Sequence, residues 1–102
     1  MNRTYLSLYE NEERAVEITI RDQDDVDFTP SAVYAEIRDV DGIVVVDEAV
    51  CLVVANKAYT LVSDSVTAVP GKYNVIWRIM KTIEGGIIYK YFHKTELIVE
   101  EL

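Results

Sequence analysis

The sequence predicts an all-β fold, an antiparallel sandwich of about seven strands with little or no helix. Apolar and polar residues alternate along most of the chain, and polar or glycine-containing turns separate the alternating segments. No long window shows the 3.6-residue apolar period of a helix. With 102 residues, half of them hydrophobic, the chain can build one modest core, so we expect a single domain over residues 1–102.

The alternation also places the strands. We expect strands over residues 4–8, 15–21, 33–38, 43–54 and 58–62. Asp39-Val-Asp-Gly42 suits a tight hairpin turn, whereas the Asp-rich segment 22–31, with Pro30, must be a loop. Asp47-Glu48 predicts a bulge or break in the fourth segment, and Asn56-Lys57 predicts a turn. Residues 63–70 form an irregular connection with room for one helical turn.

Residues 71–100 predict two long strands around a turn at Glu84-Gly85-Gly86. A two-residue loop would pair Trp77 with Lys94 and bring charges onto the face of the largest apolar ring. A three-residue loop pairs Trp77 with His93 instead. Because burying an unpaired charge costs several kcal/mol, we predict the three-residue loop.

This register divides the hairpin into two faces. The inner face belongs to the core, for which we expect Ile18, Ile37, Tyr73, Val75, Trp77 and Leu97. The outer face mixes apolar and basic side chains, which is unusual for a plain solvated surface. We interpret it as an interface made by Ile76, Arg78, Met80, Ile88, Lys90, Phe92 and Lys94.

The net charge of −8 is unevenly distributed. Residues 1–50 carry thirteen acids and four arginines (−9), and residues 51–102 carry five acids and six bases (+1). An acidic surface repels phosphates, so we expect no nucleic-acid partner. The opposite charges of the acidic half and the basic hairpin face favour a head-to-tail contact between copies.

The chain begins without a basic and apolar signal segment, and its apolar runs are far shorter than the roughly 20 residues of a membrane helix. We therefore expect synthesis in the cytoplasm and no membrane partner. The single Cys51 has apolar neighbours, which predicts a buried, inert thiol.

No catalytic or cofactor motif is present, and we predict no enzyme activity, cofactor or metal. Asp22, Asp24, Asp25 and Asp27 are ligands of the kind Ca²⁺ favours but lack the calcium-hand spacing, so a solvated loop is the preferred interpretation and a weak Ca²⁺ site the alternative. The lone His93 is expected to pack against Trp77 and bond within the sheet. Tyr89, Tyr91 and Trp77 could form a sugar-binding surface, but the register places Trp77 and Tyr91 on the inner face, so core packing is the preferred interpretation.

Pro70-Gly-Lys-Tyr-Asn-Val75 resembles the immunoglobulin-type entry into strand F, with Tyr73 as the corner tyrosine and Val75 at the cysteine position. Ile18 would occupy the other cysteine position, so the resemblance implies a sandwich without a disulfide. The departure is Trp77, which lies on the strand corresponding to F, whereas immunoglobulin domains carry their tryptophan on strand C.

Residues 14–99 are also similar to small immunoglobulin-like domains of tailed-phage virion proteins, such as the amino-terminal domains of baseplate upper proteins. The similarity lies in the turn signals Asp27-Phe-Thr-Pro-Ser-Ala32, Ile37-Arg-Asp-Val-Asp-Gly42 and Gly71-Lys-Tyr73. It implies a non-enzymatic structural module of a neck, tail or baseplate, located in the virion, with itself or other virion proteins as partners. The alternative function is a carbohydrate-binding or Ca²⁺-dependent adhesion module.

Overall fold

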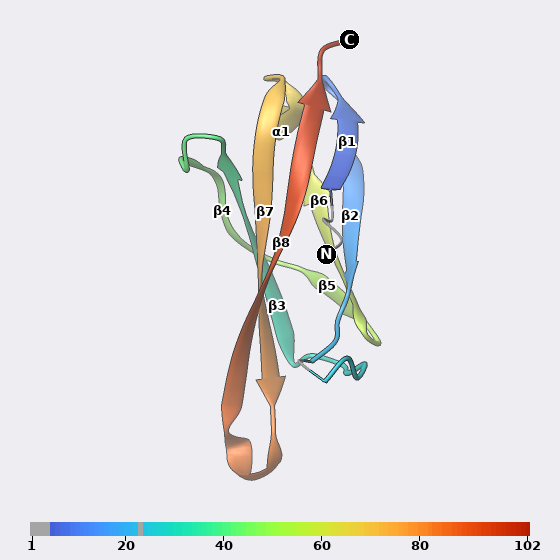
Figure 1. Cartoon of the computed structure of the whole chain (residues 1–102), viewed down its shortest axis with the longest axis vertical. Helices are drawn as coiled ribbons and strands as arrows, with labels where there is room; N and C mark the ends of the chain where they lie inside the picture. Colours follow the sequence, from blue (N-terminus) through green and yellow to red (C-terminus); the bar gives the residue numbers. More distant parts are fainter. Residues whose placement is uncertain (1–4, 23) are drawn as a thin grey trace.

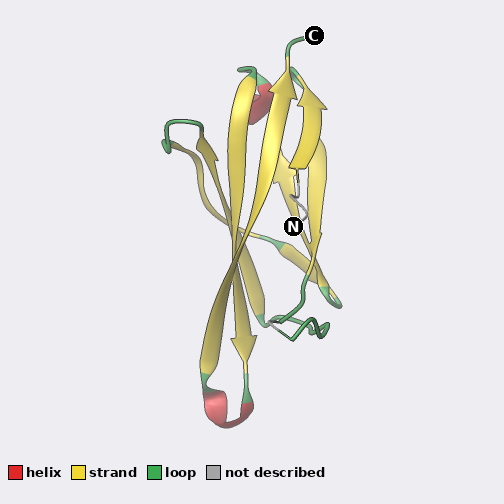
Figure 2. Cartoon of the chain, viewed as in Figure 1, coloured by secondary structure: helices red, strands yellow, loops and turns green. Residues whose placement is uncertain are grey.

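The computed structural model describes residues 5–22 and 24–102, and within them two β-sheets pack face to face (Figure 1). The larger sheet has the strand order β1-β8-β7-β3-β4 and the smaller sheet the order β2-β6-β5. The strands are β1 (Tyr5–Tyr9), β2 (Arg14–Thr19), β3 (Ala32–Asp39), β4 (Val44–Val50), β5 (Leu52–Val54), β6 (Lys57–Val62), β7 (Gly71–Thr82) and β8 (Ile88–Glu100). Helical structure among the described residues is limited to α1 (Asp64–Thr67) and one 3₁₀ turn (Glu84–Gly86), shown in red in Figure 2. The all-β prediction is confirmed.

The strand count and one strand direction differ from the prediction. The segment 43–54 is not one element: it changes sheets at Cys51, whose N–H donates to the carbonyl of Val33 (2.9 Å), so that β4 and β5 lie in opposite layers. The described residues therefore contain eight strands. The sandwich is also not fully antiparallel, because β1 runs parallel to β8.

Several local predictions are confirmed and one is wrong. Asp47 and Glu48 form the expected bulge, because both lie opposite Glu36 between the pairs Ala35–Ala49 and Ile37–Val46. The helical turn within residues 63–70 is α1. The turn expected at Asn56-Lys57 instead comprises Ala55 and Asn56, and Lys57 already pairs with β2. The predicted start of the first strand at Thr4 lies outside the described residues.

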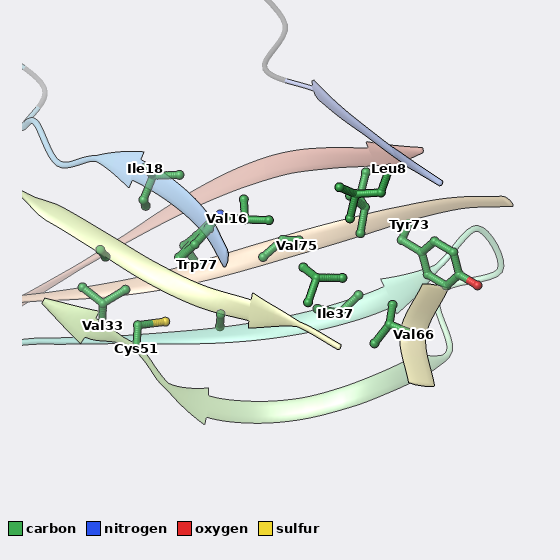
Figure 3. Packing of buried hydrophobic residues seen from close by; sticks show 14 of the residues in the cluster. Leu8, Val16, Ile18, Val33, Ile37, Cys51, Val66, Tyr73, Val75 and Trp77 are labelled. Carbon is green, nitrogen blue, oxygen red and sulfur yellow. The ribbon is translucent and has the colours of Figure 1, made fainter. Parts of the chain in front are cut away.

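The core fills the space between the two sheets (Figure 3). Every residue expected there lies in it: Ile18, Ile37, Tyr73, Val75, Trp77 and Leu97 are each 7% exposed or less. Trp77 is fully buried, and its indole N–H donates to the Thr95 hydroxyl (3.1 Å). The Tyr73 hydroxyl donates to the carbonyl of Val69 (2.6 Å), which fastens the start of β7 to the preceding connection.

The β7–β8 hairpin has the predicted register, with Tyr73 opposite Leu97, Trp77 opposite His93 and Ile79 opposite Tyr91. A three-residue loop closes it: Ile83 N–H donates to the Ile87 carbonyl (2.8 Å), and Gly85 and Gly86 both have positive φ. Glycine adopts this backbone conformation without the strain that a side chain would add. The prediction from unpaired charge was therefore sufficient to fix the register.

The hairpin is longer than its neighbours. β3 pairs with β7 only as far as Met80, and β1 pairs with β8 only from Glu96 onward. The end of the hairpin therefore projects beyond the rest of the larger sheet, at the bottom of Figure 1. All residues from 84 to 90 are exposed. We call residues 81–90 the distal hairpin.

Candidate interaction surface

The seven predicted interface residues share the outer face of the larger sheet but differ in exposure. Ile88, Lys90, Phe92 and Lys94, all on β8, are exposed, and Phe92 reaches 67%. Ile76, Arg78 and Met80, all on β7, are only partly exposed. The difference follows from topology, because β7 lies between β8 and β3, and side chains from both neighbours cover its outer face.

Arg78 is held by its own sheet. Its guanidinium carbon lies 4.6 Å from the ring centroid of Tyr34 on β3, and its Nη2 lies 2.8 Å from a carboxylate oxygen of Glu48 on β4. A planar cation stacked on an aromatic ring and paired with a carboxylate has limited freedom to reach a partner. We therefore infer that Arg78 stabilises the outer face through β3 and β4 and does not itself contact a partner.

The edge of β8 is open over a long stretch. Among residues 5–22 and 24–102, no strand pairs with β8 between Ile88 and Thr95 on the side away from β7. We call this stretch the β8 edge. Unpaired edges of this length carry backbone donors and acceptors that can add another strand.

The backbone direction within the β8 edge follows from the turn. Ile83 and Ile87 form a hydrogen-bonded pair, and such pairs alternate along an antiparallel ladder. Tyr89 and Tyr91 therefore bond to β7, while the backbone groups of Lys90 and Phe92 point to the open side. The Met80 carbonyl, opposite Lys90, accordingly accepts from Ser31 N–H (2.9 Å) on the other side of β7.

The base of the distal hairpin contacts the Asp-rich segment 22–31, which we call the acidic loop. The Lys81 ammonium lies 3.8 Å from a carboxylate oxygen of Asp22 and 4.6 Å from the ring centroid of Phe28, whose ring is 5.9 Å from that of Tyr91. The N–H groups of Val26 and Asp24 donate to the Asp22 carboxylate, and these bonds together with Lys81 lower its pKa despite some desolvation.

The acidic loop organises itself through its own contacts. Besides the Asp22 turn, the Arg21 guanidinium pairs with Asp27 (2.9 Å) and Asp25 (3.4 Å). Throughout the part of the chain that the structure describes, no three His, Cys, Asp or Glu side chains gather in a way that could hold a metal ion. Asp22 thus stabilises the turn, and Asp25 and Asp27 form ion pairs with Arg21.

His93 lies opposite Trp77 in the register, as the predicted loop requires, but the residue is exposed. The Trp77 indole N–H donates to the Thr95 hydroxyl. Partial burial desolvates the imidazole and lowers the pKa of His93.

The three aromatic residues considered for sugar binding do not form a common platform. Trp77 is fully buried, and Tyr89 meets Tyr91 edge to face with ring centroids 6.4 Å apart.

Cys51 is 7% exposed, and burial raises the pKa of its thiol, as expected for an unreactive cysteine.

A hollow of about 520 Å³ lies on the same outer face, at the end far from the hairpin turn. Its lining residues are Val40, Lys72, Tyr73, Asn74, Glu96, Leu97 and Ile98. No sequence pattern predicted this hollow, because it depends on the position of the turn after β3 beside β7. The described residues that line it contain no constellation of nucleophile, base and acid.

Sequence reasoning also missed the opposite edge of the larger sheet. β4 is the last strand there, and Val44, Val45 and Val50 are exposed, Val50 to 79%. The alternating pattern predicted a strand over 43–54 but could not show which of its sides would lack a neighbour.

A scan against protein-family models finds no match, and a search of curated proteins finds no significant match. No helix among the described residues is long and apolar enough to cross a membrane.

Proposed function

We propose that this chain is an immunoglobulin-like sandwich that serves as a non-enzymatic assembly module of a phage or prophage particle. Two features of the fold support the first half of this proposal. If β2, β6 and β5 are taken as strands B, E and D, and β8, β7, β3 and β4 as G, F, C and C′, the strand orders match those of immunoglobulin-type sandwiches. The Tyr73 hydroxyl bonds to the backbone just upstream, as a corner tyrosine does.

The observation that carries the functional half is the projecting hairpin. It exposes Ile87 (57%), Ile88 (55%) and Tyr89 (47%), and Phe92 (67%) lies next to it on β8, on the same outer face as Ile88. Within the described chain, the distal hairpin contributes little to the core, and apolar side chains are costly to keep in water. Large exposed apolar patches mark sites of contact with other proteins.

The assignment to a phage particle rests on the resemblance of residues 14–99 to small domains of tailed-phage virion proteins. In such a particle the module would contact copies of itself or other neck, tail or baseplate proteins. No step of chemistry is required of it.

Mass spectrometry of purified particles tests this function. Particles induced from the host that encodes the chain should contain it in stoichiometric amount relative to the other virion proteins. Absence of the chain from intact particles would overturn the assignment. Loss of the chain from particles when Phe92→Asp and Ile88→Asp are combined, but not with Leu61→Asp on the smaller sheet, would place the contact on the hairpin; Leu61 is similarly exposed (63%).

A thermal-shift screen with Ca²⁺ and glycans separates the alternative function. A ligand at 100 times its Kd adds about 2.7 kcal/mol to the free energy of unfolding. The assembly function predicts no such shift, and a clear shift with one of these ligands would favour an adhesion module.

A further inference from the structure

We propose that the β8 edge of one copy pairs with the outer edge of β4 in a second copy, in antiparallel orientation, so that the larger sheets join into one continuous sheet. This inference rests on the proposed assembly function and names its partner and contact. It requires two unpaired edges, compatible strand directions and matching side chains, and the structure supplies all three.

The two edges belong to the same sheet and are both open in the described chain. On the side away from β7, no described residue pairs with β8 from Ile88 to Thr95, and β4 is the terminal strand at the opposite edge. β8 and β7 are antiparallel, as are β7 and β3, and β3 and β4. β4 therefore runs opposite to β8, and a second copy in the same orientation presents β4 antiparallel to the β8 edge, the more stable pairing.

The charges of the two edges are complementary. Residues 88–95 contain Lys90 and Lys94 and no acid, whereas residues 44–50 contain Asp47 and Glu48 and no base. Pairing β8 with a second β8 around Phe92 would set Lys90 against Lys94, and like charges directly opposite each other destabilise a sheet. Charge thus favours β4 over β8 as the partner edge.

The side chains also match in one register. Glu48 forms an ion pair with Arg78 and therefore lies on the outer face. Phe92 is opposite Arg78 in the register, so Lys90, two positions from Phe92 along β8, lies on the outer face as well. If Lys90 faces Glu48 of the second copy, antiparallel register places Ile88 opposite Val50. Ile88 is 55% exposed and Val50 79% exposed, so the pairing covers two apolar side chains beside one ion pair.

The backbone geometry makes the β8 edge specifically testable. The N–H of Lys90 points to the open side, so Lys90→Pro removes a donor from the edge without removing a bond to β7. Lys90→Ala removes the same charge and retains the N–H. Comparison of the two variants separates backbone pairing from charge.

The contact joins two different edges, so it predicts an asymmetric mixing result. One variant blocks the β8 edge (Lys90→Pro), and another blocks the β4 edge (Asp47→Lys with Val50→Lys); both β4 positions are exposed, and the Glu48–Arg78 pair remains. Each variant retains one functional edge. Mixed together, they should form a heterodimer that cannot grow.

Sedimentation velocity of the full chain at high protein concentration provides the test. Wild type should self-associate, more strongly at low salt, and Lys90→Pro should weaken association at least about tenfold beyond Lys90→Ala, since one edge hydrogen bond and its neighbours are lost. An equimolar mixture of the two blocked variants should sediment as a dimer. If Lys90→Pro is not folded by circular dichroism, Lys90→Glu with Lys94→Glu replaces it as the blocked β8 edge.

Three results would overturn the pairing: a strictly monomeric wild type at low and high salt, equal association of Lys90→Pro and Lys90→Ala, or a mixture that remains monomeric. None of these results contradicts the presence of the chain in a particle, which mass spectrometry tests separately. Failure of the edge pairing and failure of the assembly function are therefore distinguishable.

Discussion

The two ends of the β7–β8 hairpin are both rich in apolar side chains but have different environments. Near Trp77 the inner residues are buried between two sheets, whereas in the distal hairpin residues 84–90 are exposed on both faces. Both ends contain runs of apolar residues, Val75-Ile-Trp77 and Ile87-Ile-Tyr89. The difference shows that a β-prone sequence specifies a strand, while the presence of a second sheet decides whether its apolar side chains stabilise the fold or remain available to a partner.

The largest expected difference between the two ends is in aromatic truncation. Trp77→Ala should lower the free energy of unfolding by about 3–5 kcal/mol, because it removes a fully buried ring and leaves a cavity. Phe92→Ala, at a 67% exposed position, should change it by no more than about 0.5 kcal/mol. Urea denaturation monitored by circular dichroism measures both. Equal losses would show that Phe92 is part of the core.

The next comparison concerns a threonine at each end. Thr95→Val removes the acceptor of the Trp77 indole N–H and leaves that donor buried, which should cost about 1–3 kcal/mol. Thr82→Val, at an exposed position of the same hairpin, should stay within about 0.5 kcal/mol of wild type. Chemical denaturation of the two variants in parallel measures both changes in the free energy of unfolding. An unchanged stability of Thr95→Val would show that the indole hydrogen bond does not stabilise the fold.

Tyrosine hydroxyls offer a smaller contrast. Tyr73→Phe loses the bond to the Val69 carbonyl and should cost about 1 kcal/mol, visible as a lower denaturation midpoint. Tyr89→Phe, in the distal hairpin, should leave that midpoint unchanged. A neutral Tyr73→Phe would contradict a structural role for the corner at the start of β7.

The smallest effect is the pH dependence contributed by His93. Desolvation lowers its pKa in the folded state, so the unfolded chain takes up a proton first as the pH falls. The contribution of His93 is therefore complete above the unfolded pKa of about 6.5 and declines below it. His93→Gln should flatten the stability profile between pH 7 and 6. A profile identical to wild type over this range would show that His93 titrates alike in both states.

The sequence predicted the interior of this protein better than its edges. The cost of burying an unpaired charge fixed the hairpin register, and period-two alternation identified Ile18, Ile37 and Val75 as core residues. The sequence pattern did not predict the change of sheet at Cys51, because an apolar run such as 50–54 suits either layer. Local sequence indicates pairing across a tight turn, but it does not show which strands lie side by side when they are far apart in the chain.

The same limit applies to the candidate surface. The outer face was predicted from the register, but the covering of Arg78 by Tyr34 and Glu48 depends on β3 and β4 lying next to β7. The open edges of β8 and β4 likewise follow from strand order and unequal strand lengths. These are long-range properties, and they became visible only in the structure.

The claim that the β8 edge pairs with a second copy is tested most directly by residue-resolved amide hydrogen exchange at low and high protein concentration. This measurement compares the two sides of β8 in one experiment. At low concentration the amides of Tyr89 and Tyr91 should be protected by β7, while those of Lys90 and Phe92 exchange rapidly. At high concentration Lys90 and Phe92 should become protected, and Tyr89 and Tyr91 should change little. Exchange of Lys90 and Phe92 that remains fast at every concentration where the protein associates would contradict the β8 edge as the contact.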